Sequence, residues 1–400
     1  MGDLIHDADA LIARTPEEFR DSGIDVHLEH EVVAIDTQAR AVRVRGPAGE
    51  RSESFDQLVI ATGAIPVRPE LPGSHAAGIH GIQTITDGIA LRGDVDAGPR
   101  RAVVVGAGYI GLEMAEALHR RGLQVTVIDR SPQPMSTLDV DMGALVADAV
   151  RSLGIELRLG VSVESFATGA DGRVTAVHTS DGVLPADVVV LGLGVRPASG
   201  LAGEAGIDVG VTGGIVTDRR MATSVEGIWA AGDCVEVFHR VSRRPVAIAL
   251  GTHANKEGRV VGVNATGGSL TFPGVIGTAV TKLCEHEIAR TGLTEREAHE
   301  AGFTAVAATI ESTTRARYYP ESAPITVKIV AEEHTGRLLG AQVIGREGAA
   351  KRIDMLAVAI WREMTADEFS QLDVGYAPPF SPVAEPALVA AHRVAVKISS

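Results

Sequence analysis

The 400-residue sequence predicts an α/β protein with two Rossmann-like nucleotide-binding domains, the first of them truncated, followed by a C-terminal α+β domain. Three observations favour this fold class. A glycine fingerprint lies between two apolar strands within residues 100–130, a pattern that starts at Asp56 occurs again at Asp187, and alternating apolar stretches begin near Leu270.

The fingerprint belongs to a strand–turn–helix–strand unit. Residues 102–105 form an apolar run typical of a buried strand, residues 109–121 have helical spacing of apolar side chains, and residues 125–128 form a second strand. Three glycines have GxGxxG spacing where the first strand meets the helix: Gly106, Gly108 and Gly111. We therefore predict dinucleotide binding; the alternative is a glycine-rich turn in an ordinary βαβ unit.

Each part of this unit has a role in holding phosphate. The first glycine makes the tight turn, the second lets a pyrophosphate approach the backbone, and the third packs the helix against the strand. The helix N-terminus offers N–H groups that have no intrahelical partner. Asp129 ends the second strand, where its carboxylate would accept hydrogen bonds from ribose hydroxyls and favour NADH over NADPH. The basic Arg130 beside it weakens that preference.

The repeated pattern indicates two related domains. DQLVIATGAIPVRP (56–69) and DVVVLGLGVRP (187–197) each have a glycine seven residues after the aspartate, namely Gly63 and Gly194. Gly106 precedes Asp187 by 187 − 106 = 81 residues, and the same distance before Asp56 falls before residue 1. The first domain is therefore expected to lack its fingerprint half.

Both ends of the chain have recognisable local patterns. Residues 1–55 predict a short helix after residue 15, a strand at 24–28 and a hairpin at 31–45. Near the C-terminus, helices are expected at 295–300 and 350–362. They accompany an antiparallel sheet with strands predicted at 278–283, 304–310, 325–330 and 338–344. The segment TKLCEHEIA, which contains Cys284, is also expected to be a sheet strand.

Composition excludes several classes of function. The formal net charge of −14 argues against a sequence-independent grip on nucleic acid, and no apolar run approaches the length of a membrane span. The first residues show no export signal, so a cytoplasmic setting is expected. Cys234 and Cys284 are far apart and the histidines are scattered, so we predict inert packed cysteines and no metal site.

The separated motifs together resemble the FAD/NAD-dependent pyridine nucleotide-disulfide oxidoreductases, and within them the coenzyme A-disulfide reductase and NADH oxidase branch. The resemblance covers nearly the whole chain. Its motifs are RTPEEF (14–19), HEVVAID (30–36), LVIATG (58–63), GAGYIGLE (106–113), LGVRP (193–197), GIWAAGD (227–233), GRLLGAQVIG (336–345), KRIDMLAVAI (351–360) and YAPPFS (376–381).

The resemblance implies a homodimer that uses FAD and NAD(P)H and passes hydride from nicotinamide to flavin, then to a small-molecule disulfide or to oxygen. It divides the chain into a discontinuous FAD-binding domain at 1–88 and 211–268, an NAD(P)H-binding domain at 89–210 and a dimerisation domain at 269–400. The family's FAD fingerprint and redox cysteine are expected upstream of Met1. A thiol-independent NADH oxidase or dehydrogenase, and a catalytically impaired NAD-binding dimer module, stay open as alternatives.

The resemblance also assigns residues. It places Gly194 at the NAD site and Asn255 at the substrate, and it implies FAD contacts for Val32, Ala61, Thr62, Gly63, Asp233 and Thr252. Asp233 follows a predicted strand at 228–231, where an acceptor-only carboxylate suits ribose or ribityl hydroxyls; the alternative is a turn-forming aspartate.

Four residues are candidates for catalysis by resemblance. Tyr109 would be an aromatic gate that moves aside when nicotinamide stacks on flavin, and Glu113 would lie beside the nicotinamide. Tyr376, and after it Tyr319, would reach the flavin of the partner subunit. The alternatives are a packed tyrosine, a solvated glutamate and two interface aromatics. The segment 383–386 reads VAEP, without the lysine that the family often has there, which puts coenzyme A specificity in question.

Overall fold

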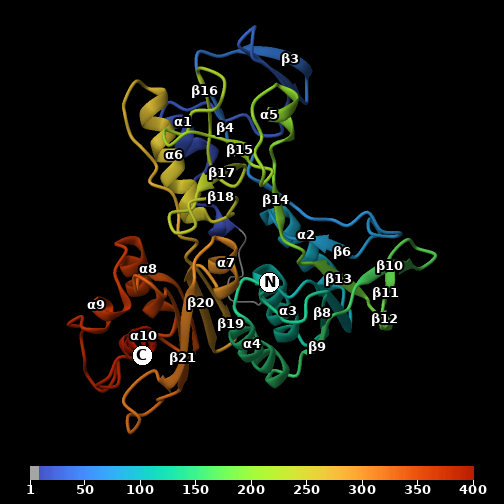
Figure 1. Cartoon of the computed structure of the whole chain (residues 1–400). Coiled ribbons are helices and arrows are strands. Elements are labelled where there is room, and N and C mark those ends of the chain that lie inside the picture. Colours follow the sequence, from blue (N-terminus) through green and yellow to red (C-terminus); the bar gives the residue numbers. More distant parts are fainter. Residues whose placement is uncertain (1–8) are drawn as a thin grey trace.

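The computed structural model of the chain describes residues 9–400 and has three lobes (Figure 1). The upper lobe contains the first five strands together with α1, α5 and α6. The central lobe contains the fingerprint sheet. The C-terminal lobe contains the last five strands and the last helices. The α/β fold class predicted from the sequence is confirmed.

The central lobe is built on a five-stranded parallel sheet of strand order β6-β13-β7-β8-β9. Its strands are β6 (Ile79–Gly81), β13 (Val188–Leu191), β7 (Arg101–Val105), β8 (Gln124–Asp129) and β9 (Glu156–Leu159). The helices are α2 (Ile85–Asp96), α3 (Tyr109–Arg120) and α4 (Val140–Ser152). A side meander comprises β10 (Val163–Thr168), β11 (Val174–Thr179) and β12 (Gly182–Pro185). All of β13 is buried, as expected for a parallel strand covered on both faces.

The upper lobe pairs β4 (Leu58–Ile60) in parallel with β16 (Ile228–Ala230), and α6 (Gly251–Ala265) packs beside them. An antiparallel meander comprises β1 (Glu31–Asp36), β2 (Ala41–Gly46) and β3 (Gly49–Ser54). A small sheet comprises β15 (Ile215–Val216), β17 (Val235–Phe238) and β18 (Pro245–Val246). The short helices are η1 (Asp9–Leu11), α1 (Pro16–Asp21) and α5 (Gly200–Glu204).

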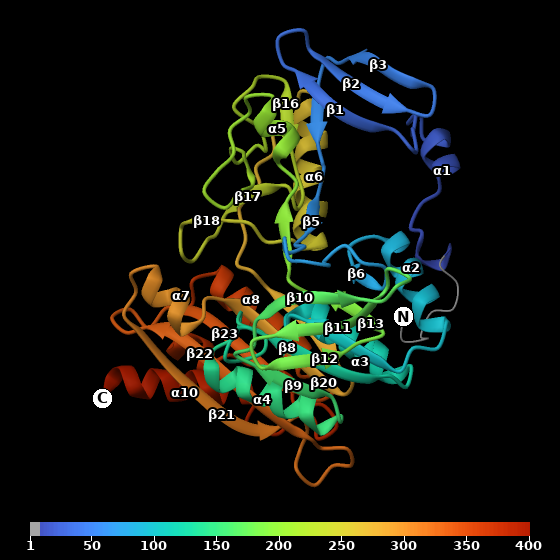
Figure 2. The same ribbon diagram turned by 90° about the vertical axis from the view of Figure 1, so that its right-hand side faces the viewer.

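The repeated sequence pattern forms the two crossings between these lobes. After β4 the chain turns at Gly63 (φ +69°), and after β13 it turns at Gly194 (φ +84°), both in the left-handed region that favours glycine. The strands that follow, β5 (Ala64–Pro66) and β14 (Val195–Pro197), pair with each other in antiparallel fashion at the junction (Figures 1 and 2). The two copies of the pattern are therefore in direct contact.

The C-terminal lobe is a five-stranded antiparallel sheet of order β19-β20-β23-β22-β21 with helices packed on it. Its strands are β19 (Ala279–Leu283), β20 (His286–Gly292), β21 (Ala305–Thr313), β22 (Pro324–Glu332) and β23 (Leu338–Gly345). The helices are α7 (Glu295–Glu300), η2 (Ala350–Arg352), α8 (Ile353–Trp361), α9 (Ala366–Ser370) and α10 (Pro386–Ser399). Every residue of β23 is buried, which places this strand in the middle of the lobe's core.

Two local predictions are wrong. Residues 24–28 form no strand: Ile24 and Leu28 are 49 % and 64 % exposed, and no neighbouring strand pairs with them within residues 9–400. Cys284 lies in the turn between β19 and β20, with φ +51°, and not inside a strand. The sequence also failed to indicate β3 and α10, the first because all six of its residues are exposed and it shows no apolar alternation.

Lys328 on β22 joins the C-terminal lobe to the central lobe. Its side chain is 5 % exposed, and its Nζ lies 3.3 Å from Asp139, 2.8 Å from Asp141 and 2.5 Å from Glu295. Gln342 on β23 donates to the Asp139 carboxylate at 2.6 Å and accepts from the Asp139 N–H at 2.8 Å. We call these five residues the Lys328 junction, because they fasten the start of α4 to the C-terminal sheet.

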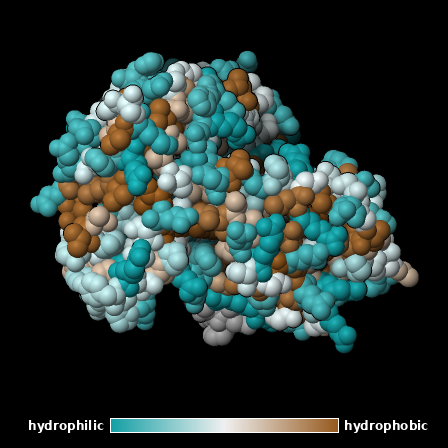
Figure 3. Space-filling model, turned by 60° about the horizontal axis from the view of Figure 1, so that its bottom comes forward, coloured by the Kyte–Doolittle hydropathy of each residue, from teal (hydrophilic) through white to brown (hydrophobic). Residues whose placement is uncertain are grey.

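Exposed apolar side chains gather on the C-terminal lobe. Tyr318, Phe380 and Val383 are 77 %, 77 % and 79 % exposed, and Tyr376 is 48 % exposed. Figure 3, which brings the bottom of the molecule forward, shows apolar surface on the left, the side of this lobe, and further apolar patches in the middle and on the right. No helix within residues 9–400 is both long enough and apolar enough to span a bilayer.

Candidate functional site

The glycine fingerprint forms a close-packed turn at the carboxyl end of β7. A Cβ at Gly106 would lie 2.3 Å from the Gly192 carbonyl oxygen, and a Cβ at Gly111 would lie 1.9 Å from the Gly106 carbonyl oxygen. Gly108, the N-cap of α3, has open space around it and supplies no side-chain cap. The first N–H groups of α3 therefore face a space that admits a phosphate, so the cradle fits a dinucleotide.

Asp129 closes the turn from the end of β8. One carboxylate oxygen accepts the N–H of Ala107 at 2.7 Å, and the other accepts the N–H of Ser131 at 2.7 Å. The residue predicted to bind ribose thus also holds the fingerprint backbone in place. The structure brings Gly106, Gly108, Gly111 and Asp129 together as predicted. Gly192, two residues before Gly194, was not predicted, although the GLG pattern was a visible signal.

Tyr109 and Glu113 occupy one side of α3 beside the cradle. The Tyr109 hydroxyl is buried without a hydrogen-bond partner among the described residues, and burial raises the pKa of this phenol. A buried hydroxyl without a partner is costly, and the role of Tyr109 as an aromatic gate stays a prediction. Glu113 is exposed and accepts a hydrogen bond of 2.6 Å from Thr281 on β19. The site therefore extends to the edge of the C-terminal lobe.

A second hollow lies at the carboxyl ends of β4 and β16 and along α6. Its lining is dominated by small residues: Val59, Ala61, Gly63, Ala231, Gly232, Asp233, Gly251, Ala254, Gly258, Val261 and Gly262. Asp233 makes no side-chain hydrogen bond within residues 9–400, and burial raises the pKa of its carboxyl group. A hydroxyl-rich ligand would give this carboxylate the donors that it lacks, so the hollow fits part of FAD.

Some residues predicted at the flavin do not line this hollow. The Thr62 hydroxyl donates instead to the Ala198 carbonyl at 2.6 Å and so holds the crossing between the lobes. Val32 lies on β1 and is 39 % exposed, while Thr252 and Asn255 are exposed near the start of α6. Their roles at FAD or substrate stay predictions.

Glu257 is a functional candidate that the sequence analysis missed. It is 2 % exposed beneath the hollow, and its Oε2 accepts the Gly232 N–H at 2.8 Å. Burial, together with the nearby Asp233, raises the pKa of Glu257 to about 7. The available signal was a carboxylate on the helix side that also carries Val260 and Val261.

Replacing Glu257 by glutamine is expected to stabilise the protein at alkaline pH. The folded-state pKa of this acid lies above its ordinary 4.5, so the native state loses stability as pH rises from 4.5 through 7. Glu257→Gln should therefore raise the free energy of unfolding at pH 8 by about 2–3 kcal/mol and change it little at pH 4.5. Thermal unfolding at both pH values measures this. Glu300→Gln on the surface of α7 is the matched control, and an equal effect of Glu257→Gln at both pH values would contradict the argument.

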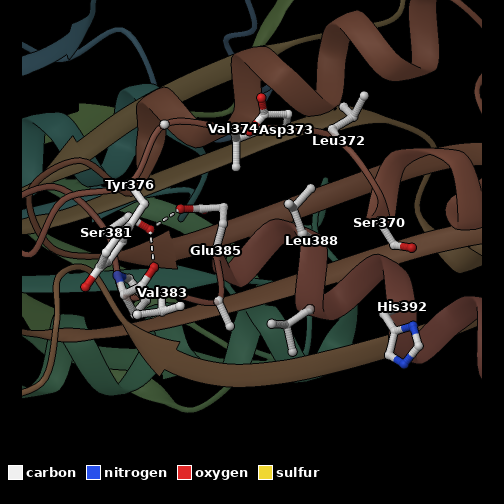
Figure 4. Close-up of a pocket in the computed structure, with 14 residues that line it drawn as sticks. Ser370, Leu372, Asp373, Val374, Tyr376, Ser381, Val383, Glu385, Leu388 and His392 are labelled. Carbon is white, nitrogen blue, oxygen red and sulfur yellow. Dashed lines mark hydrogen bonds between the residues drawn. The ribbon is translucent and has the colours of Figure 1, made fainter.

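Tyr376 lies in a separate hollow on the C-terminal lobe (Figure 4). Figure 4 shows it beside Ser381 and Glu385; the Ser381 hydroxyl donates to Glu385 at 2.6 Å, and Arg352 donates to Glu385 at 2.8 Å. Desolvation and the adjacent Tyr318 hydroxyl raise the pKa of Tyr376. Tyr318 therefore lies next to Tyr376, and the roles predicted for Tyr376 and Tyr319 at the partner's flavin stay predictions. Within one chain this hollow shares no lining residue with the flavin hollow.

The two cysteines are not activated nucleophiles. Cys234 is buried, its Sγ donates to the Ala231 carbonyl at 3.3 Å, and burial raises the pKa of its thiol. Cys284 is half-buried, and burial and the Glu116 carboxylate raise the pKa of its thiol. Within residues 9–400 no group of three or more His, Cys, Asp or Glu residues is arranged to hold a metal ion.

Comparisons with known proteins agree with this geometry. The family model described as pyridine nucleotide-disulphide oxidoreductase matches residues 5–258, and its dimerisation-domain model matches residues 278–387. The NAD(P)H sulfur oxidoreductase (CoA-dependent) of Pyrococcus furiosus is 38 % identical over 385 residues, which cover 96 % of this chain and 86 % of that protein. The NADH oxidase of Methanocaldococcus jannaschii is 36 % identical over 396 residues, which cover 98 % of this chain and 88 % of that protein.

Two solved structures are similar along the whole chain. The NAD-dependent persulfide reductase from A. fulgidus has a TM-score of 0.96 and 37 % identity, covering 100 % of this chain and 75 % of that one. The water-forming NADH oxidase from Lactobacillus brevis bound to NADH has a TM-score of 0.94 and 29 % identity. The match covers 100 % of this chain and 88 % of that one. The predicted family resemblance is therefore confirmed. FAD and NAD(P)H are confirmed as the cofactors of this family. The chain belongs to the pyridine nucleotide-disulphide oxidoreductases, a family of FAD-dependent enzymes.

Proposed function

We propose that this oxidoreductase passes hydride from NAD(P)H to FAD and reduces the sulfur–sulfur bond of a coenzyme A-linked disulfide or persulfide. The observation that carries the proposal is the junction of the two lobes. The β5–β14 pairing ties the fingerprint sheet to the flavin hollow through two copies of the same turn. The names of the relatives, which include CoA-dependent sulfur oxidoreductases and a coenzyme A disulfide reductase, support the sulfur acceptor.

In this proposal the residues of the chain position and shield the reactants. The cradle from Gly106 to Gly111 binds the pyrophosphate of NAD(P)H, Asp129 binds a ribose, and Gly194 shapes the turn nearby. Tyr109 covers the nicotinamide position until the nucleotide enters, and Glu113 lies at its rim. On the other side, Ala61, Gly63 and Asp233 would hold FAD, which supplies the hydride acceptor when bound.

The domain boundaries given above belong to the same proposal. We assign NAD(P)H binding to 89–210, FAD binding to 1–88 and 211–268, and dimerisation to 269–400; residues 1–8 lie outside the described residues. The exposed apolar surface around Tyr376 and Phe380 supports a homodimer in which Tyr376, and after it Tyr319, faces the partner's flavin. The molar mass in solution tests the dimer. The two unpaired cysteines support a cytoplasmic setting.

The acceptor is tested by NADH consumption in FAD-supplemented protein, under nitrogen and in air. We expect oxidation of NADH under nitrogen only when coenzyme A disulfide or coenzyme A persulfide is added. Turnover in air that is unchanged by either sulfur compound would favour the oxidase function, which the relatives named NADH oxidase support. NADH binding without retention of FAD would instead identify a non-catalytic nucleotide-binding module. Gly93→Ala, in the exposed part of α2, is a control that should match the wild type.

A further inference from the structure

Strand β19 of the C-terminal lobe lies against α3, the helix of the glycine fingerprint (Figure 1). The Thr281 hydroxyl on this strand donates to the Glu113 carboxylate at 2.6 Å. The Cys284 N–H, in the turn after the strand, donates to the Glu116 carboxylate at 2.7 Å. Positions 113 and 116 are three apart and so lie on one side of the helix. The C-terminal lobe therefore holds that side of α3 through two carboxylates.

The two carboxylates differ in what else holds them. Glu116 also pairs with Arg120 at 3.1 Å, one turn later on α3, so its position is set within the helix as well. Within residues 9–400 Glu113 makes no ion pair, and Thr281 is the one hydrogen-bond partner of its side chain. An exposed glutamate without a partner samples many rotamers. The direction of the Glu113 carboxylate therefore depends on Thr281.

Thr281 is a rigid donor. It is 9 % exposed, and it lies opposite Ile288 of β20 in the antiparallel ladder of the C-terminal sheet. A β-branched side chain has few favourable rotamers, so the hydroxyl keeps one direction. A hydroxyl that donates to a carboxylate forms a charge-assisted hydrogen bond, which is stronger than a bond between neutral groups. The threonine therefore fixes the glutamate, and not the reverse.

The contact occupies one half of the Glu113 carboxylate. Thr281 donates to Oε1, and Oε2 has no hydrogen-bond partner within residues 9–400. Glu113 lies four residues after Tyr109, one turn along α3 from the phosphate cradle, where the proposed function places the nicotinamide. A ligand that enters there meets an acceptor oxygen whose direction is already set, so less side-chain freedom is lost on binding.

We infer that Thr281 is a positioning residue for nicotinamide binding, because it holds the Glu113 carboxylate in the direction in which the nicotinamide meets it. The C-terminal lobe then takes part in the nucleotide site of its own chain, in addition to the dimerisation that we propose for it. The inference rests on the proposed function in one respect, that the nicotinamide lies beside Glu113. It does not depend on the sulfur acceptor.

The test is calorimetric titration of the FAD-supplemented full chain with NAD⁺ and with ADP-ribose, which has the same pyrophosphate and adenosine but no nicotinamide. NAD⁺ is the suitable probe because it cannot reduce the flavin during the titration. Thr281→Val keeps the size of the side chain and removes the donor. It should weaken NAD⁺ about fivefold or more and leave ADP-ribose unchanged. Thr281→Ser keeps a hydroxyl and should bind NAD⁺ nearly as tightly as the wild type.

Two further variants show whether the effect passes through Glu113. In a Glu113→Ala background, Thr281→Val should cause no additional loss of NAD⁺ affinity, because the two residues act as one unit. Thr309→Val is the matched control. It removes a similar hydrogen bond of 2.8 Å, from the C-terminal sheet to Asp141 on α4, and should change neither affinity.

Two results would overturn the inference alone. One is an unaltered NAD⁺ affinity in Thr281→Val, and the other is an equal loss for NAD⁺ and ADP-ribose, which a general disturbance of α3 would cause. If the wild type binds NAD⁺ no more tightly than ADP-ribose, the nicotinamide gains nothing beside Glu113, and the inference fails with that part of the proposed function. If neither ligand binds, the proposed function fails as a whole. A failure in the sulfur-acceptor assay alone would leave these titrations unaffected.

Discussion

Replacing Gly111 by alanine is expected to lower the affinity for NADH by about 100-fold or more, because the whole phosphate cradle would have to shift. A Cβ at this position would lie 1.9 Å from the Gly106 carbonyl oxygen and 3.0 Å from the Gly106 carbonyl carbon. Gly192 closes the other side, since a Cβ there would lie 2.7 Å from the Gly111 Cα. Helix α3 would therefore move away from β7, and its N–H groups would no longer point at the pyrophosphate. Fluorescence titration with NADH measures the loss.

Two glycine variants distinguish a local change in the phosphate cradle from general misfolding. Gly93→Ala in α2 meets no atom within 4 Å and should retain NADH affinity. Its alanine should stabilise the helix by about 0.5–1 kcal/mol. Gly108→Ala also meets no protein atom within 4 Å, so it should fold normally and yet bind NADH weakly, because its methyl group occupies the ligand's space. Wild-type affinity in Gly111→Ala would show that the pyrophosphate binds elsewhere.

Lys328→Met is expected to lower the free energy of unfolding by about 3 kcal/mol, because it leaves the buried Asp139 carboxylate, and beside it the half-exposed Asp141 and Glu295, without their cation. Asp139 is 8 % exposed, and Asp141 and Glu295 face the same ammonium group. The pKa of Lys328 is raised, chiefly by hydrogen bonds to Asp141 and Glu295 that outweigh its desolvation, and the lysine lowers the pKa of Asp141. Urea unfolding of the full chain measures the change.

The pH dependence of this variant identifies the cause. In the wild type the depressed pKa of Asp141 gives stability that is present above pH 3.8 and is lost as pH falls through the lower, folded-state pKa. In Lys328→Met the carboxylates repel one another until they take up protons, so the deficit against wild type should be larger at pH 8 than at pH 4. Lys351→Met removes an exposed lysine paired with Asp354 and should cost less than about 1 kcal/mol. A deficit that does not change with pH would point to lost packing and not to charge.

The parts of the fold that the sequence predicts are those with a local signal. The fingerprint unit was predicted because glycine spacing, helical periodicity and apolar strand runs are all visible within about thirty consecutive residues. The false strand at 24–28 had the apolar content of a strand but no partner, and pairing is a property of the sheet. The strand β3 was missed for the converse reason, because GERSES pairs with β2 through its backbone while its side chains are all exposed.

The charged and glycine residues described above also fall into those with a local sequence signal and those without one. Gly106, Gly111 and Asp129 follow from spacing alone, because the chemistry of the turn is contained in consecutive residues. Glu257 and Lys328 depend on burial against segments distant in sequence, and a single sequence does not state which charged residues are buried. The direction of the Asp129 carboxylate is set by the backbone of Ala107, which no motif records.

The pairing of β5 with β14 has a mechanical consequence. A single connecting strand would leave the lobes joined at one point, whereas two hydrogen-bonded strands running in opposite directions hold each other along three residue pairs. Any movement of the fingerprint lobe against the upper lobe therefore has to deform both connecting strands together.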